Sequence, residues 1–117
     1  MSKEEIAVSF SNGEFDKIIE HLSDEADWEI VGDIKFIGKP AIVENCTQVS
    51  AYFRSVNTTF TTLNVIVQDN KVVVNGTGKF TRDSQVLSFV AACDLYEFDN
   101  NGKILNITSY CIPTEET

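Results

Sequence analysis

The sequence is short of several residue types on which common chemistries depend. It has one histidine and one tryptophan, and its nine lysines and arginines stand against eighteen acids, so the net charge is −9. A single histidine leaves few ligands for a zinc site, and we predict no metal. Because the acidic excess repels phosphates and anionic lipid headgroups, we expect no nucleic-acid or membrane partner. No apolar run reaches the roughly 18 residues of a membrane span.

The cysteines are few and form no Cys-x-x-Cys pair. Cys46, Cys93 and Cys111 are odd in number and have apolar neighbours, which favours buried, reduced thiols over disulfides. The N-terminal segment also lacks the long apolar core of a secretory signal. We therefore predict a cytoplasmic protein. Neither a phosphate-binding loop nor a dinucleotide fingerprint occurs, and we predict no cofactor.

What is present suits one folded unit. The chain has 117 residues, of which 43% are hydrophobic and 10% aromatic. That length supports a single core and leaves no room for a second domain of usual size. We therefore predict one domain over residues 1–117.

The first half of the chain carries helical periodicity. Apolar residues recur every three or four positions over 6–10 and 15–22, on either side of a break at Ser11-Asn12-Gly13. A further stripe runs from Lys39-Pro40 to Phe53, where the proline suits a first helical turn. These patterns predict three helices. Between the second and third, the alternation around Trp28 and Ile30 predicts a strand.

The second half reads as a meander of strands. We predict strands over 58–68, 71–81, 85–98 and 103–112, joined by connections too short for a parallel crossover. Gly76 and Gly78 inside the second of them indicate strong curvature or a bulge. The predicted fold class is therefore α+β, with three N-terminal helices packed in a curved, mainly antiparallel sheet that encloses a cavity.

Three segments carry a resemblance to a known family. They are Asn12-Gly13-Glu14-Phe15-Asp16 with Leu22 to Trp28, Phe36-Ile37-Gly38-Lys39-Pro40-Ala41-Ile42, and Asp94-Leu95-Tyr96-Glu97-Phe98 with Gly102-Lys103-Ile104 and Tyr110. In this order the chain resembles the nuclear transport factor 2-like superfamily, which includes ketosteroid isomerases and SnoaL-like polyketide cyclases. The resemblance implies a cone with a small-molecule pocket and a homodimer formed through the sheet.

The resemblance implies a role for Asp94, but two other groups of the ketosteroid isomerase site have no counterpart in this chain. Asp94 matches the protonated acid of ketosteroid isomerase, which donates to an oxyanion beside a tyrosine and a carboxylate base. In this chain Ile30 stands where the base is expected and Ile6 where the tyrosine is expected. Both groups contribute strongly to that reaction, so steroid isomerisation is disfavoured.

Asp94 is also singled out by its own strand. It is the one charge in Val90-Ala91-Ala92-Cys93-Asp94-Leu95-Tyr96, which looks buried on both faces. Burial would raise its pKa and suit it to proton donation or general base catalysis, with Tyr96 as a hydrogen-bond donor. The alternative is a structural carboxyl bonded to backbone or hydroxyl groups, or one exposed at an edge.

Several further residues are candidates for ligand contact. By strand parity Phe98 shares the face of Asp94, and Trp28 shares a face with Ile30. On the last strand Ser109 and Cys111 share one face and Tyr110 takes the other, with the inward face left open. His21 reads as a solvated or capping residue. The candidate ligand-binding residues are Trp28, Ile30, Phe10, Phe36, Cys46, Phe98 and Ser109, although core packing alone explains most of them.

Two functions of different classes follow. In the first, the chain is a SnoaL-like domain whose apolar pocket holds a small apolar molecule without turnover, or is filled by its own side chains while the sheet forms a dimer. In the second, it is a cofactor-independent isomerase, cyclase or lyase that acts on a small carbonyl compound, with Asp94 as acid or base. Substrate identity lies beyond the sequence.

Overall fold

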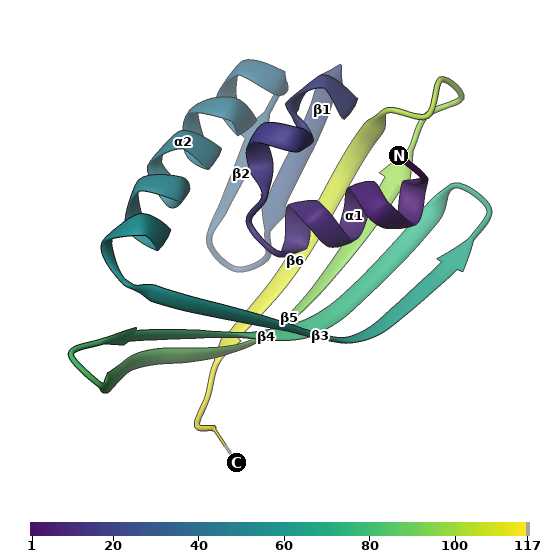
Figure 1. Cartoon of the computed structure of the whole chain (residues 1–117). Coiled ribbons are helices and arrows are strands. Elements are labelled where there is room, and N and C mark those ends of the chain that lie inside the picture. The colour runs from purple at the N-terminus through teal and green to yellow at the C-terminus, as the bar shows by residue number, and fades with distance from the viewer. Residues whose placement is uncertain (117) are drawn as a thin grey trace.

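The computed structural model describes residues 1–116. Its chain runs through a helix, two short turns and two strands, then a long helix and four strands (Figure 1). Helical elements gather near the N-terminus and four long strands follow the last of them. The elements are α1 (Lys3–Ser11), the 3-10 turns η1 (Phe15–Lys17) and η2 (Ile19–His21), β1 (Leu22–Ile30), β2 (Ile34–Ile37), α2 (Lys39–Ser55), β3 (Asn57–Gln68), β4 (Lys71–Arg82), β5 (Gln85–Phe98) and β6 (Ile104–Pro113).

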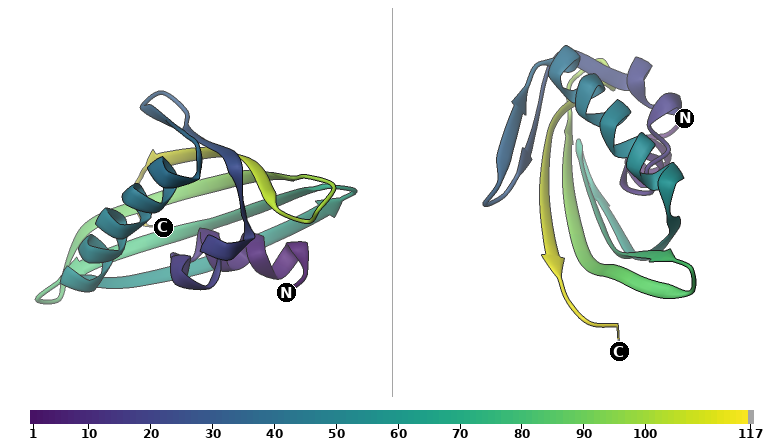
Figure 2. Two further views of the ribbon diagram at one scale, coloured as in Figure 1. Left: turned by 90° about the horizontal axis from the view of Figure 1, so that it is seen from above. Right: turned by 90° about the vertical axis from the view of Figure 1, so that its left-hand side faces the viewer.

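The strands form one mixed sheet in the order β2-β1-β6-β5-β4-β3. The four predicted strands of the second half are confirmed within one residue at each end, and they pair antiparallel as expected. Only β1 and β6 pair in parallel. The sheet curves, and α1 and α2 lie on its concave side (Figure 2). The α+β class and the curved sheet are thus confirmed.

The prediction of three helices is wrong, because the structure has two α-helices. The expected second helix, over 15–22, consists of two short 3-10 turns. Their hydrogen bonds join residues three apart, from Ile18 N to Phe15 O and from His21 N to Ile18 O. Such turns place Phe15 and Ile18 on the core at the same spacing of three that suggested a helix. Leu22 then enters the sheet.

The first strand also begins earlier than the pattern indicates. Alternation is visible in sequence only around Trp28, whereas β1 starts at Leu22, which pairs with Ile104 of β6. The register of β1 against β6 shifts between Leu22 and Asp27. The buried residues Leu22, Ala26 and Trp28 keep a spacing of two or four, but the exposed Asp24 stands among them, so the apolar alternation is broken at the start of the strand.

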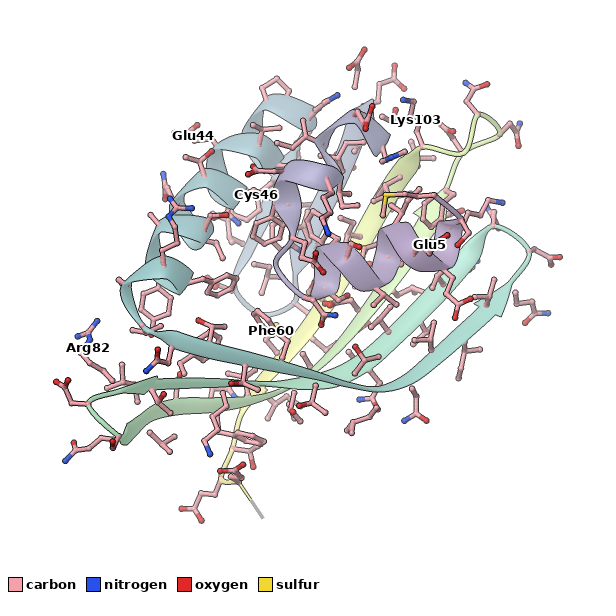
Figure 3. All side chains as sticks on the ribbon, viewed as in Figure 1. Glu5, Glu44, Cys46, Phe60, Arg82 and Lys103 are labelled. Atoms are coloured by element: carbon pink, nitrogen blue, oxygen red, sulfur yellow. The ribbon has the colours of Figure 1, made fainter. Side chains whose placement is uncertain are left out.

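Helix α2 follows the sequence signals closely. Gly38 precedes it with a φ of 89°, a backbone conformation that favours glycine, and Pro40 lies in the first turn. Ile42 and Cys46 on its inner side are fully buried. Cys46, labelled in Figure 3, lies between this helix and the rest of the core. The predicted third helix is therefore confirmed, as the second α-helix of the fold.

The core and the curvature together leave space inside the cone. Buried residues of α1, α2 and the sheet form one cluster that includes Phe10, Ile42 and Tyr96. Gly76 faces Thr62 where the pairing of β3 and β4 shifts register, as the two glycines led us to expect. A Cβ at Gly76 would overlap the carbonyl oxygen of Thr61. Within residues 1–116, no helix has the length and apolar character to cross a membrane.

Candidate functional site

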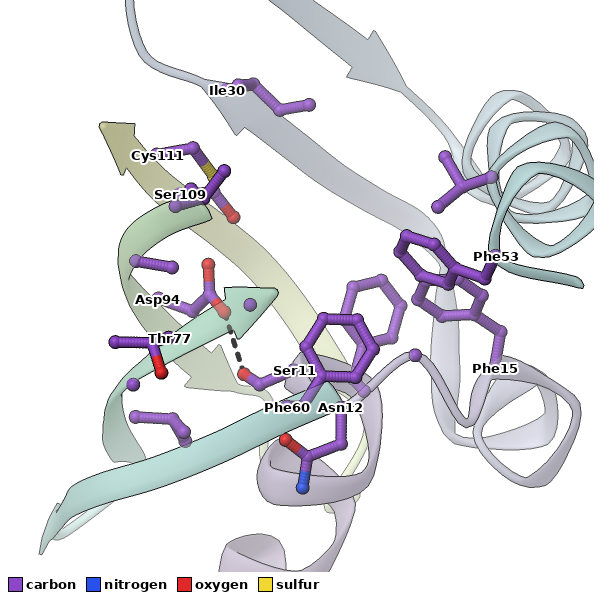
Figure 4. A pocket seen from close by; sticks show the side chains of 18 of the residues that line it. Ser11, Asn12, Phe15, Ile30, Phe53, Phe60, Thr77, Asp94, Ser109 and Cys111 are labelled. Atoms are coloured by element: carbon purple, nitrogen blue, oxygen red, sulfur yellow. Dashed lines mark hydrogen bonds between the residues drawn. The ribbon is translucent and has the colours of Figure 1, made fainter. Parts of the chain in front are cut away.

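A cavity of about 380 Å³ lies between the concave side of the sheet and the two helices. Figure 4 shows two unlike ends: Asp94, Ser109, Cys111 and Ser11 lie toward one end, Phe15 and Phe53 lie at the other, and Phe60 stands between them near Ser11. Most of the lining is apolar, as is usual for small-molecule sites. The residues used below are drawn from this lining: Phe10, Ser11, Phe15, Trp28, Ile30, Asp33, Phe36, Asn45, Val49, Phe53, Phe60, Phe80, Ala92, Asp94, Ser109 and Cys111.

Asp94 reaches the cavity from β5 and is held by a hydroxyl from α1. Ser11 Oγ donates to Asp94 Oδ2 over 2.8 Å, and the same Ser11 oxygen lies 2.6 Å from the Tyr96 hydroxyl. Tyr96 shares the strand face of Asp94, and it is fully buried in the core next to Ser11. The three side chains join α1 to the centre of the sheet.

The direction of these hydrogen bonds follows from how many hydrogens each group has. A serine hydroxyl has one hydrogen, and Ser11 gives it to Asp94. Tyr96 must then donate to Ser11, which is its one side-chain partner within residues 1–116. This arrangement also satisfies the buried Tyr96 hydrogen. The chain of donors therefore runs from Tyr96 through Ser11 to the carboxyl group.

A second chain of donors approaches from the other side. Trp28 Nε1 donates to Ser109 Oγ over 2.9 Å, and an indole N–H can only donate. Ser109 pairs directly with Asp94 across β5 and β6, and its hydroxyl hydrogen is free to point to that carboxyl. Asp94 is therefore the final acceptor of two chains, a geometry that stabilises its ionised form.

Burial acts in the opposite direction on the same group. Desolvation raises the pKa of Asp94, while the hydroxyls of Ser109 and Ser11 partly lower it. Desolvation also raises the pKa of Tyr96 well above its usual range, and the nearby Asp94 charge adds to the effect. Tyr96 therefore stays protonated and keeps its hydrogen for donation. Asp94 is therefore the acid of this pair that ionises first.

The structure brings together most, but not all, of the predicted contact residues. Phe10, Trp28, Ile30, Phe36 and Ser109 line the cavity beside Asp94. The open question of the last strand is also answered: Ser109 faces inward and Tyr110 is 47% exposed. Outside the lining, in the core, lie Phe98, Cys46 and Tyr96.

Each of these three is displaced from the lining by its position in the fold. Phe98 pairs with Ile104 at the end of β5, away from the opening of the cone. On α2, Asn45 and Val49 line the cavity, whereas Cys46 between them points to the core. Tyr96 lies below Ser11.

Sequence reasoning missed Ser11 and an aromatic group at the far end of the cavity. Ser11 ends α1 and looked only like part of a helix break. Phe53 stacks on Phe80 at 5.6 Å and meets Phe60 edge to face at 5.2 Å, and Phe15 stacks on its other side at 6.3 Å. The Phe60 ring projects from β3 to the side on which the helices lie (Figure 3).

The lining is acidic where it is charged. Asp94 and, at the turn between β1 and β2, Asp33 are its acids, and the described lining includes no lysine, arginine or histidine. His21 lies on η2, outside the lining, with its Nε2 3.9 Å from Glu20 Oε1. No cluster of three or more metal-binding side chains occurs within residues 1–116.

The cysteines are free thiols with different surroundings. Cys46 is buried, which raises its pKa to about 12, whereas Cys111 is exposed at the end of the cavity and Cys93 is half-buried. The prediction that all three are buried is thus wrong for Cys111. It faces inward from β6, but the sheet ends beside it and leaves it open to solvent.

Comparisons with solved structures support the architecture. An NTF2-like protein of unknown function from Cytophaga hutchinsonii is 31% identical, with 92% of this chain and 94% of that one covered and a TM-score of 0.83. An LEH-like epoxide hydrolase of M. tuberculosis is 18% identical, over 93% and 81% of the chains, with a TM-score of 0.69. A putative SnoaL-like polyketide cyclase from Jannaschia is 14% identical, with 93% of this chain and 84% of that one covered and a TM-score of 0.73. At these lower identities the likeness concerns the fold alone.

The comparison with family sequences is more direct. No curated protein matches the chain. Residues 4–107, however, match the SnoaL-like domain as a family. This range runs from α1 into β6 and takes in Ser11, Asp94 and Tyr96. The sequence match and the 31% identical structure both cover the segments that carry the resemblance. The chain belongs to the family of SnoaL-like domains.

Proposed function

We propose that this domain binds a small, mainly apolar molecule in the cavity and that Asp94 is its polar contact. The observation that carries the proposal is the cavity of about 380 Å³, in which the Asp94 carboxyl and its hydroxyl partners stand in a largely apolar lining. A volume of this size suits a small ligand, and a few polar groups in an apolar pocket fix ligand orientation. A core filled by its own side chains would leave no such space.

Trp28 provides the test, because it is the one tryptophan of the sequence and lines the cavity. We expect small alicyclic alcohols to change its fluorescence in a saturable way. Ala92→Leu would fill the cavity and weaken this response at least tenfold. Ala91→Leu adds the same group on the other face of β5 and serves as the matched control. Equal binding by the two variants would contradict the proposal.

A second candidate function is proton transfer by Asp94 on a small carbonyl compound. Burial raises the pKa of this acid, and an upward shift of a carboxyl pKa is typical of general acids and bases. Ile30 fills the place of a second carboxylate, so Asp94 would act alone. In deuterium oxide, exchange of the α-hydrogens of a cyclic ketone should be faster with the wild-type protein than with Asp94→Asn. Equal rates would exclude this activity for the ketone tested.

We also propose a homodimer formed through the outer face of the sheet. The outward residues of the central strands are joined by register as Ile66–Val73–Leu95 and Cys93–Tyr110, with Ala91 beside Ile112. These positions carry no charge, although the chain has a net charge of −9. A second copy centred on these positions buries no acid, because the acids of the outer face, Asp27 and Glu29 on β1 and Glu97 near the end of β5, lie beside them.

A cytoplasmic location stays a proposal. It is supported by the three free cysteines, Cys46, Cys93 and Cys111, since reduced thiols are usual in a reducing compartment. Cys111 is the exposed one of the three and therefore the thiol whose oxidation state is accessible to measurement. The state of the Cys111 thiol in freshly isolated protein, measured by mass after alkylation, tests it.

A further inference from the structure

We infer that the ligand of this cavity is a hydrophobic amine, bound as its ammonium ion against the Asp94 carboxylate. The inference rests on the proposed binding function and adds the charge and polarity of the ligand. Three observations carry it: the signs of the charges in the lining, the direction of the hydrogen bonds that end at Asp94, and the segregation of the cavity into polar and aromatic ends.

The charges exclude one class of ligand. Asp94 and Asp33 are the charged residues of the described lining, and no cationic side chain there compensates either one. The negative charges of Asp94 and Asp33 would therefore repel a carboxylate or phosphate ligand from the cavity. The net charge of −9 over the whole chain adds a long-range field of the same sign, which draws cations to the molecule. Neutral and cationic ligands remain.

The hydrogen bonds favour the cation. Tyr96 and Ser11 form one chain of donors that ends on Asp94, and the hydroxyl of Ser109, already an acceptor from Trp28, supplies another. The protein therefore presents acceptor capacity to the cavity at this point. A carbonyl ligand has no hydrogen to offer it, whereas an ammonium group offers three. Charge-assisted bonds of this kind are roughly twice as strong as neutral ones.

The apolar part of the ligand has a defined direction. From the ammonium at Asp94, a ring or cage would extend past Phe60 to the end lined by Phe15 and Phe53 (Figure 4). Trp28 and Phe10 lie between the two ends and pack edge to face at 5.1 Å. Aromatic walls accept apolar groups and attract cations. The expected ligand is thus compact and apolar, with one primary amine at its edge.

Three adamantane probes test the inference, because they share one rigid cage and transmit the light that excites Trp28. They are 1-adamantanemethylamine, 1-adamantanemethanol and 1-adamantanecarboxylate. At pH 7.5 we expect the amine to bind about tenfold or more tightly than the alcohol, as for hydrogen bonds to charged groups, and the carboxylate to bind weakest. In Asp94→Asn the amine should fall to the affinity of the alcohol. Glu29→Gln, which removes an equal charge from outside the lining, should keep the preference.

A pH series on the wild-type protein gives a second readout that does not depend on a variant. The groups around Asp94 are Tyr96 on β5 and Cys111 on β6, whose pKa values are raised, Ser11 and Trp28, which do not titrate, and Cys46 on α2, with a pKa of about 12. Asp33 lies at the turn between β1 and β2. Amine affinity should therefore rise with pH through the Asp94 titration, while alcohol affinity should not.

The outcomes separate this inference from the function on which it rests. Binding of the alcohol as tightly as the amine overturns the inference and leaves a neutral-ligand pocket. An amine preference that survives in folded Asp94→Asn, or is lost equally in Glu29→Gln, overturns it as well. If none of the three probes binds, the proposed binding function fails and the inference fails with it.

Discussion

At the scale of single residues, Asp94 is subject to two opposed effects whose balance sets its chemistry. Burial raises its pKa, and the hydroxyls of Ser109 and Ser11 lower it in part. A carboxyl without such hydroxyls would stay protonated to higher pH, and a solvated one would show no shift. The network therefore keeps Asp94 within reach of ionisation inside an apolar cavity.

This balance predicts how stability depends on pH. Because the native pKa of Asp94 is raised, the folded state holds this proton at pH values where the unfolded chain, with a pKa of about 3.9, has lost it. The contribution of Asp94 to wild-type stability should therefore fall as pH rises from about 4 toward the native pKa, by about 1.4 kcal/mol for each unit of the shift.

Asp94→Asn isolates this effect, because the other acids titrate in both proteins. The stability of the variant minus that of the wild type should increase with pH across the same interval and then stay constant. Urea denaturation from pH 3 to pH 8 measures it. A difference that is flat over the whole range, or one that decreases, would show that Asp94 is not the perturbed acid.

Ser11 should matter through both of its hydrogen bonds. Ser11→Ala leaves the fully buried Tyr96 hydroxyl without a partner, a loss of about 1–3 kcal/mol of stability, and removes a donor that lowers the pKa of Asp94. We expect the carboxyl carbon of Asp94 to titrate at higher pH by NMR. Ser11→Thr keeps the hydroxyl and should restore both values.

A double-mutant cycle controls for loss of packing at Ser11. In a Tyr96→Phe background the unpaired hydroxyl is absent, so Ser11→Ala should cost less there than in the wild type. Equal costs in both backgrounds would mean that the hydroxyls of Ser11 and Tyr96 are not coupled.

The two ends of this network differ in how far sequence reveals them. Asp94 stands out as a lone charge in a strand that is otherwise apolar, so its strand alone marks it. Ser11 lies 83 positions away and carries no local signal, because serine at a helix end has many ordinary explanations. Only the packing of α1 on the sheet creates the contact, and a single sequence does not encode that packing as a readable pattern.

At the scale of elements, the hydrophobic periodicity and the turn residues predicted those helices and strands that local sequence determines. The meander and α2 were accessible because alternation, short turns and a proline at the helix start are local features. The stretch over 15–22 was mistaken for a helix, since two 3-10 turns place Phe15 and Ile18 at the same spacing. The parallel pairing of β1 with β6 joins segments about 80 positions apart, beyond any local pattern.

The curvature of β4 depends on two glycines that differ in what surrounds them. A Cβ at Gly76 would overlap the backbone oxygen of Thr61, whereas at Gly78 it would meet the Phe60 ring at 3.3 Å. A side chain can shift, but a paired backbone cannot do so without breaking register. Gly76→Ala should therefore cost about 1–3 kcal/mol, the usual range for overpacking.

Gly78→Ala is the matched control in the same strand and should cost clearly less. Urea denaturation of both variants gives the comparison, and Trp28 fluorescence reports whether the cavity is retained. If Gly78→Ala proves the more damaging, the aromatic end of the cavity, rather than the β3–β4 backbone, limits the curvature.

At the scale of the whole molecule, charge and apolar surface are distributed unequally. Acids such as Glu5 and Glu44 lie on the helices (Figure 3), and ten of the eighteen acids fall within residues 1–33. The middle of the outer face, at Val73, Leu95, Cys93 and Ala91, is uncharged, and the neighbouring Tyr110 and Ile112 are 47% and 62% exposed, whereas Lys71, Lys79 and Glu97 lie toward the ends of the same strands. Exposed apolar residues on so acidic a chain are costly to leave in water, and this is why we propose the outer face as the contact between two copies.

The proposed dimer predicts the effect of one added charge on this face. Tyr110→Asp would bring a carboxylate, and by two-fold symmetry its copy, into the interface, where burial of unpaired charge is unfavourable. We expect the wild type to sediment as a dimer and Tyr110→Asp as a monomer in the same buffer.

Val31→Asp is the control, because it adds an identical charge at an exposed apolar residue of the turn between β1 and β2, and it should stay dimeric. A stable interface of about 800 Å² on each partner would make the wild-type dimer persist at micromolar concentration. Monomeric wild-type protein, or a dimer unaffected by Tyr110→Asp, would place the apolar outer face outside any self-association.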